Sequence, residues 1–380
     1  MYAKRILYLN IHVIQAVPPS CVNRDDAGSP KTCYYGGALR ARVSSQSWKR
    51  AIRMYLREFF GDTGVRTKKI AAMLAKRLSE ETGCAPKDAV LFVKKCLSAA
   101  GVISDKDDAK DAQAFFSRDQ IDGMAEAVCR YYRENCMPAA AAQDNSAAKK
   151  KEKKSAPVEF SKEFKKELCA VAKERPAVSQ LLCGRMFASN QELGYDAACQ
   201  VAHAISVDEV REEVDYFTAV GDNDTIRDVY GIEEEHAGSD YIDSKYYTSG
   251  TLYRYADVNL SEGTELDAVD AAKAAVGFLE AFVMSMPTGS ANSYANMTVP
   301  ETVVVELRDE RPISYAPAFL KPVRGSEEMS VAEAAEEKLY KYMDKIDRKY
   351  GAPIARWELG KVSMKEMYRQ VQEEINNRRG

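Results

Sequence analysis

Residues 38–60, ALRARVSSQSWKRAIRMYLREFF, decide the predicted fold, because a short alternating segment runs there directly into an amphipathic helix. The apolar side chains of the helical part fall on one face: Trp48, Ile52, Tyr55, Leu56, Phe59 and Phe60. Lys49, Arg53 and Arg57 form a basic stripe on the opposite face. The sequence therefore predicts a strand followed at once by a helix that begins at Ser44–Ser45.

The start of this helix has the chemistry of a phosphate site. The first N–H groups of a helix have no partner within it, and they lie at the positive end of its dipole. Ser44 or Ser45 can cap one of them, while Gln46 and Lys49 lie in the first turn, where a phosphate oxygen can bind. Arg53 extends the basic stripe by one turn. An ordinary capped helix would give the same pattern, so the pattern alone leaves both interpretations open.

The charge of the chain is unevenly distributed, although its sum is only −3. Six basic residues and no acid lie in residues 40–57, whereas thirteen acids and two arginines lie in residues 206–243. This distribution predicts a surface that binds a polyanion on one side and repels it on another.

Composition and motifs argue against several other classes of protein. No run of about eighteen apolar residues is present, so we expect no membrane span. The first residues lack the pattern of a secretory signal, so we expect a cytoplasmic protein. The nine cysteines include no C-x-x-C pair and the chain has three histidines, so we expect neither a metal site nor a cofactor.

Asp25 and Asp26 are adjacent carboxylates that could hold a divalent metal for cleavage of a phosphodiester. No third ligand can be identified elsewhere in the sequence, and neighbouring acids more often pair with an arginine, here Arg24 or a residue of the basic helix. Metal-dependent cleavage of RNA therefore stays open as an alternative at this point.

The rest of the chain alternates between strand and helix patterns. Residues 4–17 are apolar on both alternating faces, which predicts a central strand covered on both sides and ended by Pro18–Pro19. We also expect a strand at 302–308 and helices at 267–286 and 331–350. Strands separated by helices indicate an α+β sandwich whose sheet is covered on one side.

Three further segments differ in composition. Helical spacing recurs from about Gly64 to Cys136. Residues 138–157 are lysine-rich and almost free of large apolar groups, which predicts a flexible insertion or, alternatively, an arm that touches nucleic acid. Residues 221–243 are acidic and glycine-rich, which is typical of a protruding loop or hairpin.

Several blocks in order resemble one known family. Residues 12–53, HVIQAVPPSCVNRDDAGSPKTCYYGGALRARVSSQSWKRAIR, are similar to the N-terminus of CasC-type backbone subunits, members of the RAMP superfamily, from the type I-E CRISPR Cascade complex. Four later blocks resemble family blocks as well: GRMFAS, VAHAIS, VDYFTAV and TSGTLYRYADVNL. The lysine-rich insertion and the acidity of residues 222–243 depart from the family pattern.

The resemblance implies a hand-like α+β fold with an RRM-like (ferredoxin-like) palm, a helical fingers insertion and a protruding thumb. The implied boundaries are 1–60, 180–212 and 253–325 for the palm, 61–179 for the fingers, 213–252 for the thumb, and 326–380 for a C-terminal helical extension.

The resemblance also implies a function in antiviral defence without catalysis. Copies of such a subunit stack head to tail in a helical filament along a CRISPR RNA, the guide, together with other Cascade subunits. The complex then pairs the guide with target DNA. Two alternatives remain: a metal-dependent endoribonuclease of the same superfamily that uses Asp25 or Asp26, and a protein-interaction module without nucleic acid.

Residue roles carry over only at matching motif positions. Positions that hold phosphates and sugars of the guide correspond to Arg24, Ser44, Gln46 and Lys49, and Arg53 is a further candidate contact. Met186 matches a residue that packs against bases near a kink. The thumb root that wedges between nucleotides corresponds to Tyr216, Phe217, Thr218 and Val220, and a base stacked on such a side chain contributes roughly 1–3 kcal/mol. Phe217 and Val220 could equally belong to the hydrophobic core.

Overall fold

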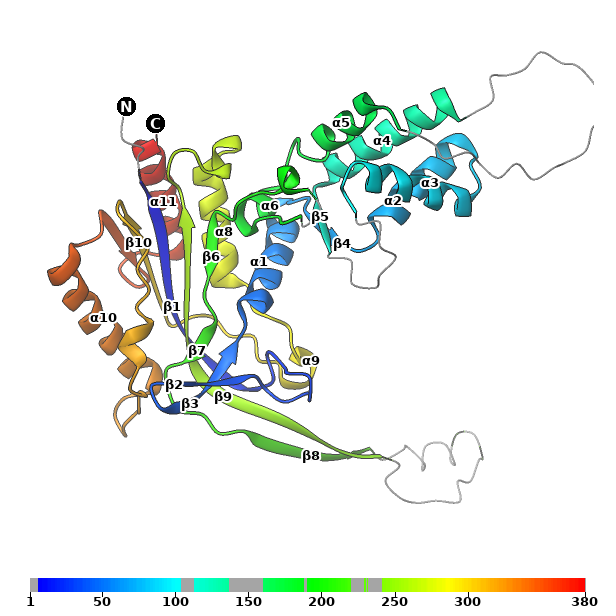
Figure 1. Cartoon of the computed structure of the whole chain (residues 1–380). Helices are drawn as coiled ribbons and strands as arrows, with labels where there is room; N and C mark the ends of the chain where they lie inside the picture. The colour runs from blue at the N-terminus through cyan, green and yellow to red at the C-terminus, as the bar shows by residue number, and fades with distance from the viewer. Residues whose placement is uncertain are drawn as a thin grey trace, which may run out of the picture. The chain divides into compact units, whose positions relative to one another are not determined.

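The computed structural model describes residues 6–103, 113–136, 160–187, 190–219, 229, 231 and 241–379 of the 380-residue chain. The chain forms two compact units (Figure 1). The first, here called the sheet unit, comprises Met1–Tyr55, Cys199–Gly263 and Asp270–Gly380. The second, the helical unit, comprises Leu56–Ala198 and Thr264–Val269.

The sheet unit is built on a mixed α/β arrangement with an antiparallel sheet. The strands lie in the order β11-β10-β1-β9-β7-β3-β2, and β6 and β8 also pair with β9. Each of these strand pairs is antiparallel. The strand bounds are β1 Tyr8–Ser20, β2 Thr32–Tyr35, β3 Ala38–Val43, β6 Cys199–Val201, β7 Ala204–Ser206, β8 Glu213–Ala219, β9 Tyr241–Asn259, β10 Thr302–Arg308 and β11 Ala355–Glu358.

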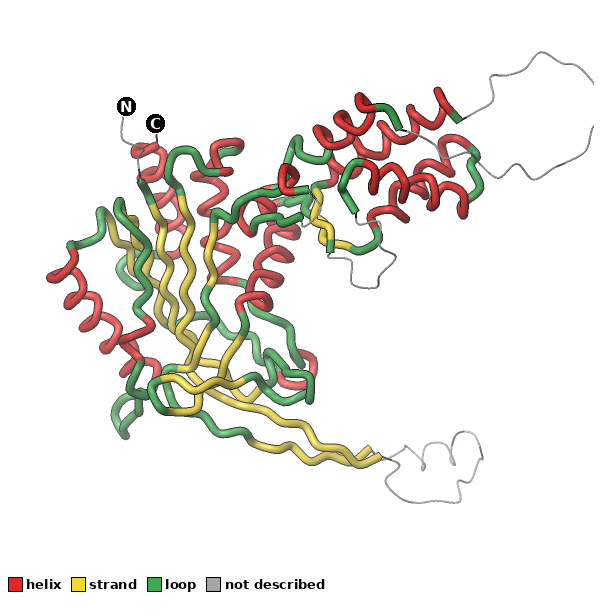
Figure 2. Tube along the Cα trace, viewed as in Figure 1, coloured by secondary structure: helices red, strands yellow, loops and turns green. Residues whose placement is uncertain are grey.

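Strand β1 is central, because it pairs with β10 on one side and β9 on the other. On one face of the sheet Ile14 and Tyr253 pack in a cluster with helix α10, Val331–Tyr350. On the opposite face Arg254 lies against Phe282 of helix α8, Ala271–Met284. Figure 2 shows helices on both sides of the strands. The doubly covered strand is confirmed, whereas the prediction of a sheet covered on one side is wrong, because α10 packs on the second face.

Strand β1 also differs from the prediction at its end. It continues through Pro18–Pro19 to Ser20 instead of stopping before the prolines. The register with β9 is irregular between Val17 and Ser20, so no ladder hydrogen bond from the prolines is required. The two prolines are exposed, which suits residues that cannot donate to a neighbouring strand.

The C-terminal part of the sheet unit follows the predicted pattern closely. Strand β10 and helix α10 have the expected bounds, and α8 lies within the predicted range. The sequence did not reveal β11, which pairs with β10 and precedes helix α11, Met364–Arg379, in the chain. Helix α11 packs against α8.

The helical unit contains most of the helices expected between residues 61 and 179. Those between Ile70 and Val171 share one hydrophobic core with members such as Leu78, Phe92 and Phe116. Their bounds are α2 Ile70–Thr82, α3 Pro86–Ala99, α4 Arg118–Asn135, α5 Lys162–Val171 and α6 Val178–Cys183. Residues 65–67 were expected to be helical. They instead form strand β4, Val65–Thr67, which pairs with β5, Ala114–Phe116. The lysine-rich residues 138–157 and most of residues 221–243 lie outside the described residues.

No helix among the described residues has both the length and the apolar character needed to cross a membrane.

Candidate nucleic-acid interface

Helix α1, Ser45–Phe60, starts directly after β3. Ser44 is its capping residue: the Ser44 Oγ accepts the backbone N–H of Ser47 at 3.4 Å, and the Ser44 carbonyl accepts the N–H of Trp48 at 3.2 Å. Ser44 is 6% exposed, Gln46 is exposed and Lys49 is half-buried. The residue that sets the helix start is therefore mostly covered, while Gln46 and Lys49 lie at its surface.

The loop after β1 lies against this helix start. The Oδ1 of Asn23 accepts the backbone N–H of Ser44 at 2.9 Å, although the two residues are far apart in the chain. Asp25 closes the loop, since its Oδ1 accepts the N–H of Ser29 at 2.9 Å. Arg24 is exposed between them. The contact of Asn23, which the sequence did not reveal, thus holds the loop that carries Arg24 against the start of α1.

The apolar face of α1 is held against the sheet by a buried arginine of β9. The Arg254 guanidinium lies 3.8 Å from the ring centroid of Trp48 and 4.6 Å from that of Phe282. Its Nη1 donates to Oε1 of Gln15 at 2.5 Å. Burial lowers the pKa of Arg254 to about 9, because the cation is removed from water. The orientation of α1 is therefore fixed by contacts on its sheet-facing side, while its basic face stays at the surface.

Arg53 continues the basic face as expected, one turn beyond Lys49. It is half-buried, and its Nη1 donates to the carbonyl of Lys49 at 3.3 Å.

The first arginine of the basic stretch does not belong to this surface. Arg40 is fully buried and donates to five backbone carbonyls, those of Ser206, Val207, Asp208, Phe319 and Leu320. It joins β3 to the chain after β7 and to the turn that precedes Leu320. The absence of acids in residues 40–57 thus overstated the exposed positive surface, because one of the six cations is structural.

The predicted protrusion is a two-stranded hairpin of β8 and the first part of β9, Tyr241–Tyr247 (Figure 1). Paired residues of a hairpin point to the same side, so the register separates its two faces. One face is uncharged and carries Val214, Tyr216, Thr218, Ile242, Ser244 and Tyr246. The other carries Glu213, Asp215, Phe217, Asp243, Lys245 and Tyr247.

The candidate thumb residues are divided between these faces. Tyr216 is 68% exposed and Thr218 is exposed, both on the uncharged face. Phe217 points to the charged face, where the Nζ of Lys245 lies 4.9 Å from its ring centroid. Phe217 therefore packs on its neighbours in the hairpin and not in the core of the sheet unit. Val220 lies outside the described residues.

Met186 belongs to the helical unit and is 92% exposed. The preceding Arg185 is buried, and its guanidinium lies 4.3 Å from the ring centroid of Tyr195 and 5.1 Å from that of Phe116. Its Nε donates to the carbonyl of Leu193 at 2.8 Å. The apolar side chain of Met186 is thus presented to solvent from a firmly anchored backbone.

The carboxylates of the endoribonuclease alternative are both exposed. Asp25 is engaged in its own loop, as described above, and no group of three or more His, Cys, Asp or Glu side chains in the described ranges is arranged to hold a metal ion. Nothing in the loop favours the metal-dependent alternative.

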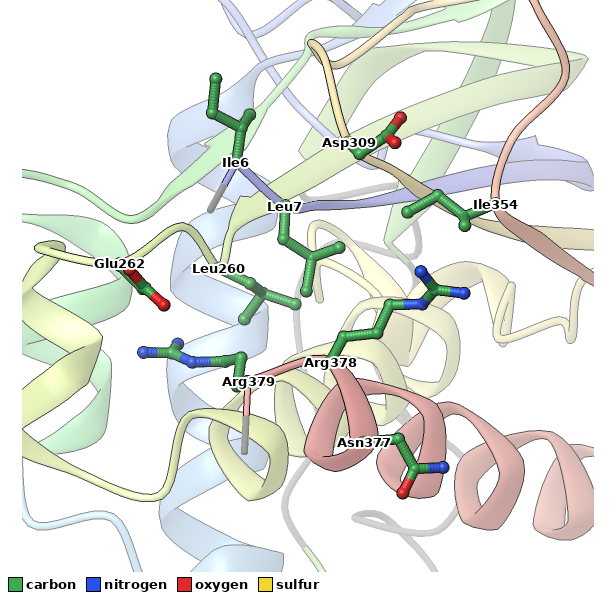
Figure 3. Close-up of a pocket in the computed structure, with 9 residues that line it drawn as sticks. All are labelled: Ile6, Leu7, Leu260, Glu262, Asp309, Ile354, Asn377, Arg378 and Arg379. Atoms are coloured by element: carbon green, nitrogen blue, oxygen red, sulfur yellow. The ribbon is translucent and has the colours of Figure 1, made fainter. Parts of the chain in front are cut away.

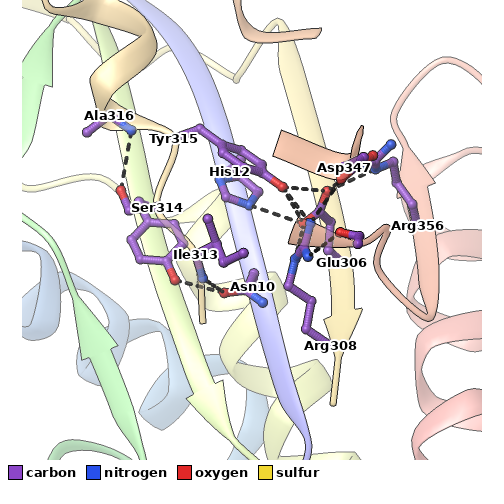
Figure 4. A network of polar contacts seen from close by, with 12 residues as sticks. Asn10, His12, Glu306, Arg308, Ile313, Ser314, Tyr315, Ala316, Asp347 and Arg356 are labelled. Atoms are coloured by element: carbon purple, nitrogen blue, oxygen red, sulfur yellow. Dashed lines mark hydrogen bonds and ion pairs between the residues drawn. The ribbon is translucent and has the colours of Figure 1, made fainter. Parts of the chain in front are cut away.

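A second polar cluster lies on the opposite side of the sheet under α10 (Figure 4). The carboxylate of Glu306 accepts hydrogen bonds from Arg308 at 2.9 Å, Arg356 at 2.7 Å and Tyr315 at 2.9 Å. Burial lowers the pKa of the neighbouring His12 to about 4, so its ring is neutral at neutral pH. His12, Glu306 and Tyr315 are buried, and the cluster joins β1, β10 and β11, which indicates a structural role.

A pocket of about 470 Å³ lies where β1 begins (Figure 3). Apolar side chains such as Leu7 and Leu260 line it together with Asp309 and Arg378. It lies at the beginning of β1, whereas the loop that carries Arg24 follows the end of this strand. None of the candidate residues takes part in the pocket.

Comparison with known proteins finds similarity to chains of CRISPR complexes. It is similar to a chain of a structure described as "CRISPR RNA-guided surveillance complex, pre-nicking", with 33% identity, a TM-score of 0.73, and 91% of this chain and 90% of that chain covered. A second such chain, from a "CRISPR RNA-guided surveillance complex", has 27% identity, a TM-score of 0.67, and coverage of 97% and 99%. No curated protein matches. The model of the CT1975-like protein family matches residues 9–378, and the chain therefore belongs to this family.

Proposed function

We propose that this chain is the guide-binding backbone subunit of a Cascade-type CRISPR RNA-guided surveillance complex. Its likeness to chains of such complexes extends over nearly the whole chain, and its family model does the same. The observation that carries the RNA-binding part is the contact between Asn23 and Ser44, which joins the exposed Arg24 to the start of a basic helix. This arrangement favours a phosphate-binding surface over an ordinary capped helix.

The chemistry of the grip follows from the surface of α1. Phosphate oxygens bind the first N–H groups of the helix together with Gln46, and they are neutralised by Arg24, Lys49 and Arg53. Ser44 holds the helix start in place from a mostly covered position. These contacts do not depend on base sequence, which suits a subunit that must accept any guide.

The hairpin supplies the second kind of contact. Tyr216 and its neighbours on the uncharged face offer aromatic and apolar surface on which bases can stack. Met186 offers similar apolar surface from the helical unit. We infer that these side chains separate and support bases of the guide, while Arg24 and α1 hold its backbone.

The finer assignment follows the hand arrangement implied by the sequence. We infer that the sheet unit is an RRM-like palm, the helical unit the fingers and the hairpin the thumb, as in the CasC-type subunit of type I-E complexes. Copies then bind head to tail along the guide, in contact with other Cascade subunits in the cytoplasm, and present it to target DNA without catalysing a reaction. The acids of the thumb would face a basic patch of the neighbouring copy.

The proposal is tested by exchanging Lys49 for glutamate. The Lys49→Glu variant should retain less guide RNA on co-purification, and its dependence of RNA affinity on salt should become flatter by about one counterion, because one phosphate contact is lost. Lys349→Glu, an equal charge reversal on exposed α10, serves as the matched control and should behave as wild type. Unchanged RNA retention by Lys49→Glu would refute the proposed phosphate contact.

A further inference from the structure

The segment that follows α8 has an unusual composition for this chain. From Ser285 to Pro300 it contains no charged residue, although 29% of all residues are charged. Within it, the stretch Thr288–Met297 includes the short helix α9, Ala291–Tyr294. Its exposed side chains are hydroxyls, an amide and short or flexible apolar groups: Thr288, Asn292, Ser293, Ala295 and Met297. We call this stretch the neutral segment.

One end of the neutral segment lies against the loop that carries Arg24. A Cβ atom built on Gly289 would be 2.1 Å from the carbonyl oxygen of Val22, so only glycine permits the two backbones to lie this close. Further along, the Oγ1 of Thr298 donates to the carbonyl of Ala16 at 2.8 Å. The segment is therefore held along the final part of β1.

The other end reaches the base of the hairpin. The ring centroid of Tyr294 lies 6.1 Å from that of Tyr247, which belongs to the hairpin part of β9. The neutral segment thus connects the two surfaces proposed to bind RNA. One is the phosphate-binding surface of Arg24 and α1, and the other is the hairpin whose side chains stack on bases. A guide RNA that runs from one surface to the other passes this segment.

The interior of the segment holds polar groups that the protein leaves unsatisfied. Both polar side-chain atoms of the fully buried Asn296, and the buried hydroxyl of Tyr294, have no hydrogen-bond partner among the described residues. The segment also keeps two non-glycine residues at positive φ, Ser290 at 52° and Ala295 at 47°. Strained backbone of this kind clusters at ligand-binding sites, which makes the segment a candidate for one.

We propose that the neutral segment is a third contact surface for the guide and that it binds ribose hydroxyls and base edges, not phosphates. This inference rests on the proposed function. Amide and hydroxyl groups such as those of Asn292 and Ser293 are suited to the 2′-hydroxyl and base edges, whereas phosphates are bound by the cations of the adjacent surface. Met297 adds apolar surface for a base. The segment therefore favours RNA over DNA of the same sequence.

The test uses the full-length chain and two labelled single-stranded oligonucleotides of one sequence, one RNA and one DNA. The double variant Asn292→Ala/Ser293→Ala should bind the RNA about tenfold more weakly, because two neutral hydrogen bonds are lost. Its affinity for the DNA and its salt dependence should stay unchanged. Both residues are exposed, so folding should be intact, which a thermal melt verifies. Asn376→Ala/Asn377→Ala, on exposed positions of α11, is the matched control.

The outcomes separate this inference from the proposed function. If Lys49→Glu weakens RNA binding while the Asn292/Ser293 variant binds RNA as wild type, the neutral segment does not contact the guide and only this inference fails. Equal losses for RNA and DNA, or a flatter salt dependence, would also overturn it, because they indicate a phosphate contact. If neither variant affects RNA binding, the proposed function itself fails. A change in assembly size with unchanged RNA affinity would assign the segment to the contact between copies.

Discussion

Asp257 and His12 lie on the same face of the sheet, since Asp257 pairs with Asn10 and His12 with Tyr255. Burial perturbs their pKa values in opposite directions. It raises the pKa of Asp257 from 3.8 to about 6, against the opposing effects of Tyr255 and Lys49, and it lowers that of His12 from 6.5 to about 4. In both cases the neutral form is favoured, because the site is shielded from water.

We predict that Asp257→Asn makes the protein more stable at pH 7 to 8. The native carboxyl holds its proton up to about pH 6, whereas the unfolded chain loses it near 3.8, so this group lowers stability by roughly 3 kcal/mol as the pH rises through that window. The variant lacks this loss. Urea unfolding between pH 4 and 8 measures it, and parallel curves for variant and wild type would contradict the assignment. His12 gives a slope of the opposite sign, since its native ring stays neutral while the unfolded one is protonated below 6.5.

At the scale of elements, β9 and α1 are joined through one side chain. Arg254 of β9 contacts Trp48 of α1, Phe282 of α8 and Gln15 of β1. The guanidinium is buried without a carboxylate partner among the described contacts, so its stabilisation comes from aromatic rings and carbonyl-type oxygens. The position of the basic face of α1 therefore depends on a residue that has no access to RNA.

We expect Arg254→Ala to lower the free energy of unfolding by about 3 kcal/mol, because it leaves a cavity beside Trp48 and removes the donor to Gln15. RNA affinity, measured at a temperature where the variant is folded, should fall severalfold although no RNA contact is removed. Arg348→Ala, an exposed position on α10, is the control. RNA affinity equal to wild type in the folded variant would show that α1 keeps its position without Arg254.

The elements that the sequence predicted well are those with local signals. Helix α10 has both its periodic apolar face and a capping box between Ser330 and Glu333, and its bounds agree with the prediction. Strand β11 and the β4–β5 pair were missed because three- or four-residue strands are defined by partners distant in the chain. The surface of Gln46 and Lys49 was expected from helix-end chemistry. The contributions of Asn23 and of the neutral segment were not expected, because they depend on contacts between parts that are distant in the chain.

At the scale of the whole molecule, the hairpin has few packing contacts with the rest of its own unit. Its strands β8 and Tyr241–Tyr247 pair with each other and carry mostly exposed side chains. Two-stranded hairpins are only marginally stable in water. Stable order in this element is therefore expected to come from a bound guide or a neighbouring copy.

Hydrogen exchange should reveal this difference. In the free chain, we predict fast amide exchange in residues 213–219 and 241–247 and slow exchange in residues 252–258, which pair within the sheet. Binding of guide RNA with assembly should slow exchange in the hairpin by about tenfold or more and leave the sheet segment unchanged. Equal protection of the hairpin in the free and assembled protein would contradict its dependence on partners.

Strand β9 runs without a break from the hairpin into the middle of the sheet, where its residues from Gly250 to Asn259 are fixed by regular pairing with β1. Residues inserted or deleted between Ala219 and Tyr241 leave that pairing unchanged, since the register is set on the far side of the strand. The position is thus suited to the insertion of an additional domain. If copies assemble along the guide as proposed, a fluorescent domain or an effector inserted there would be carried by every copy, with the pairing of β9 and β1 left in register.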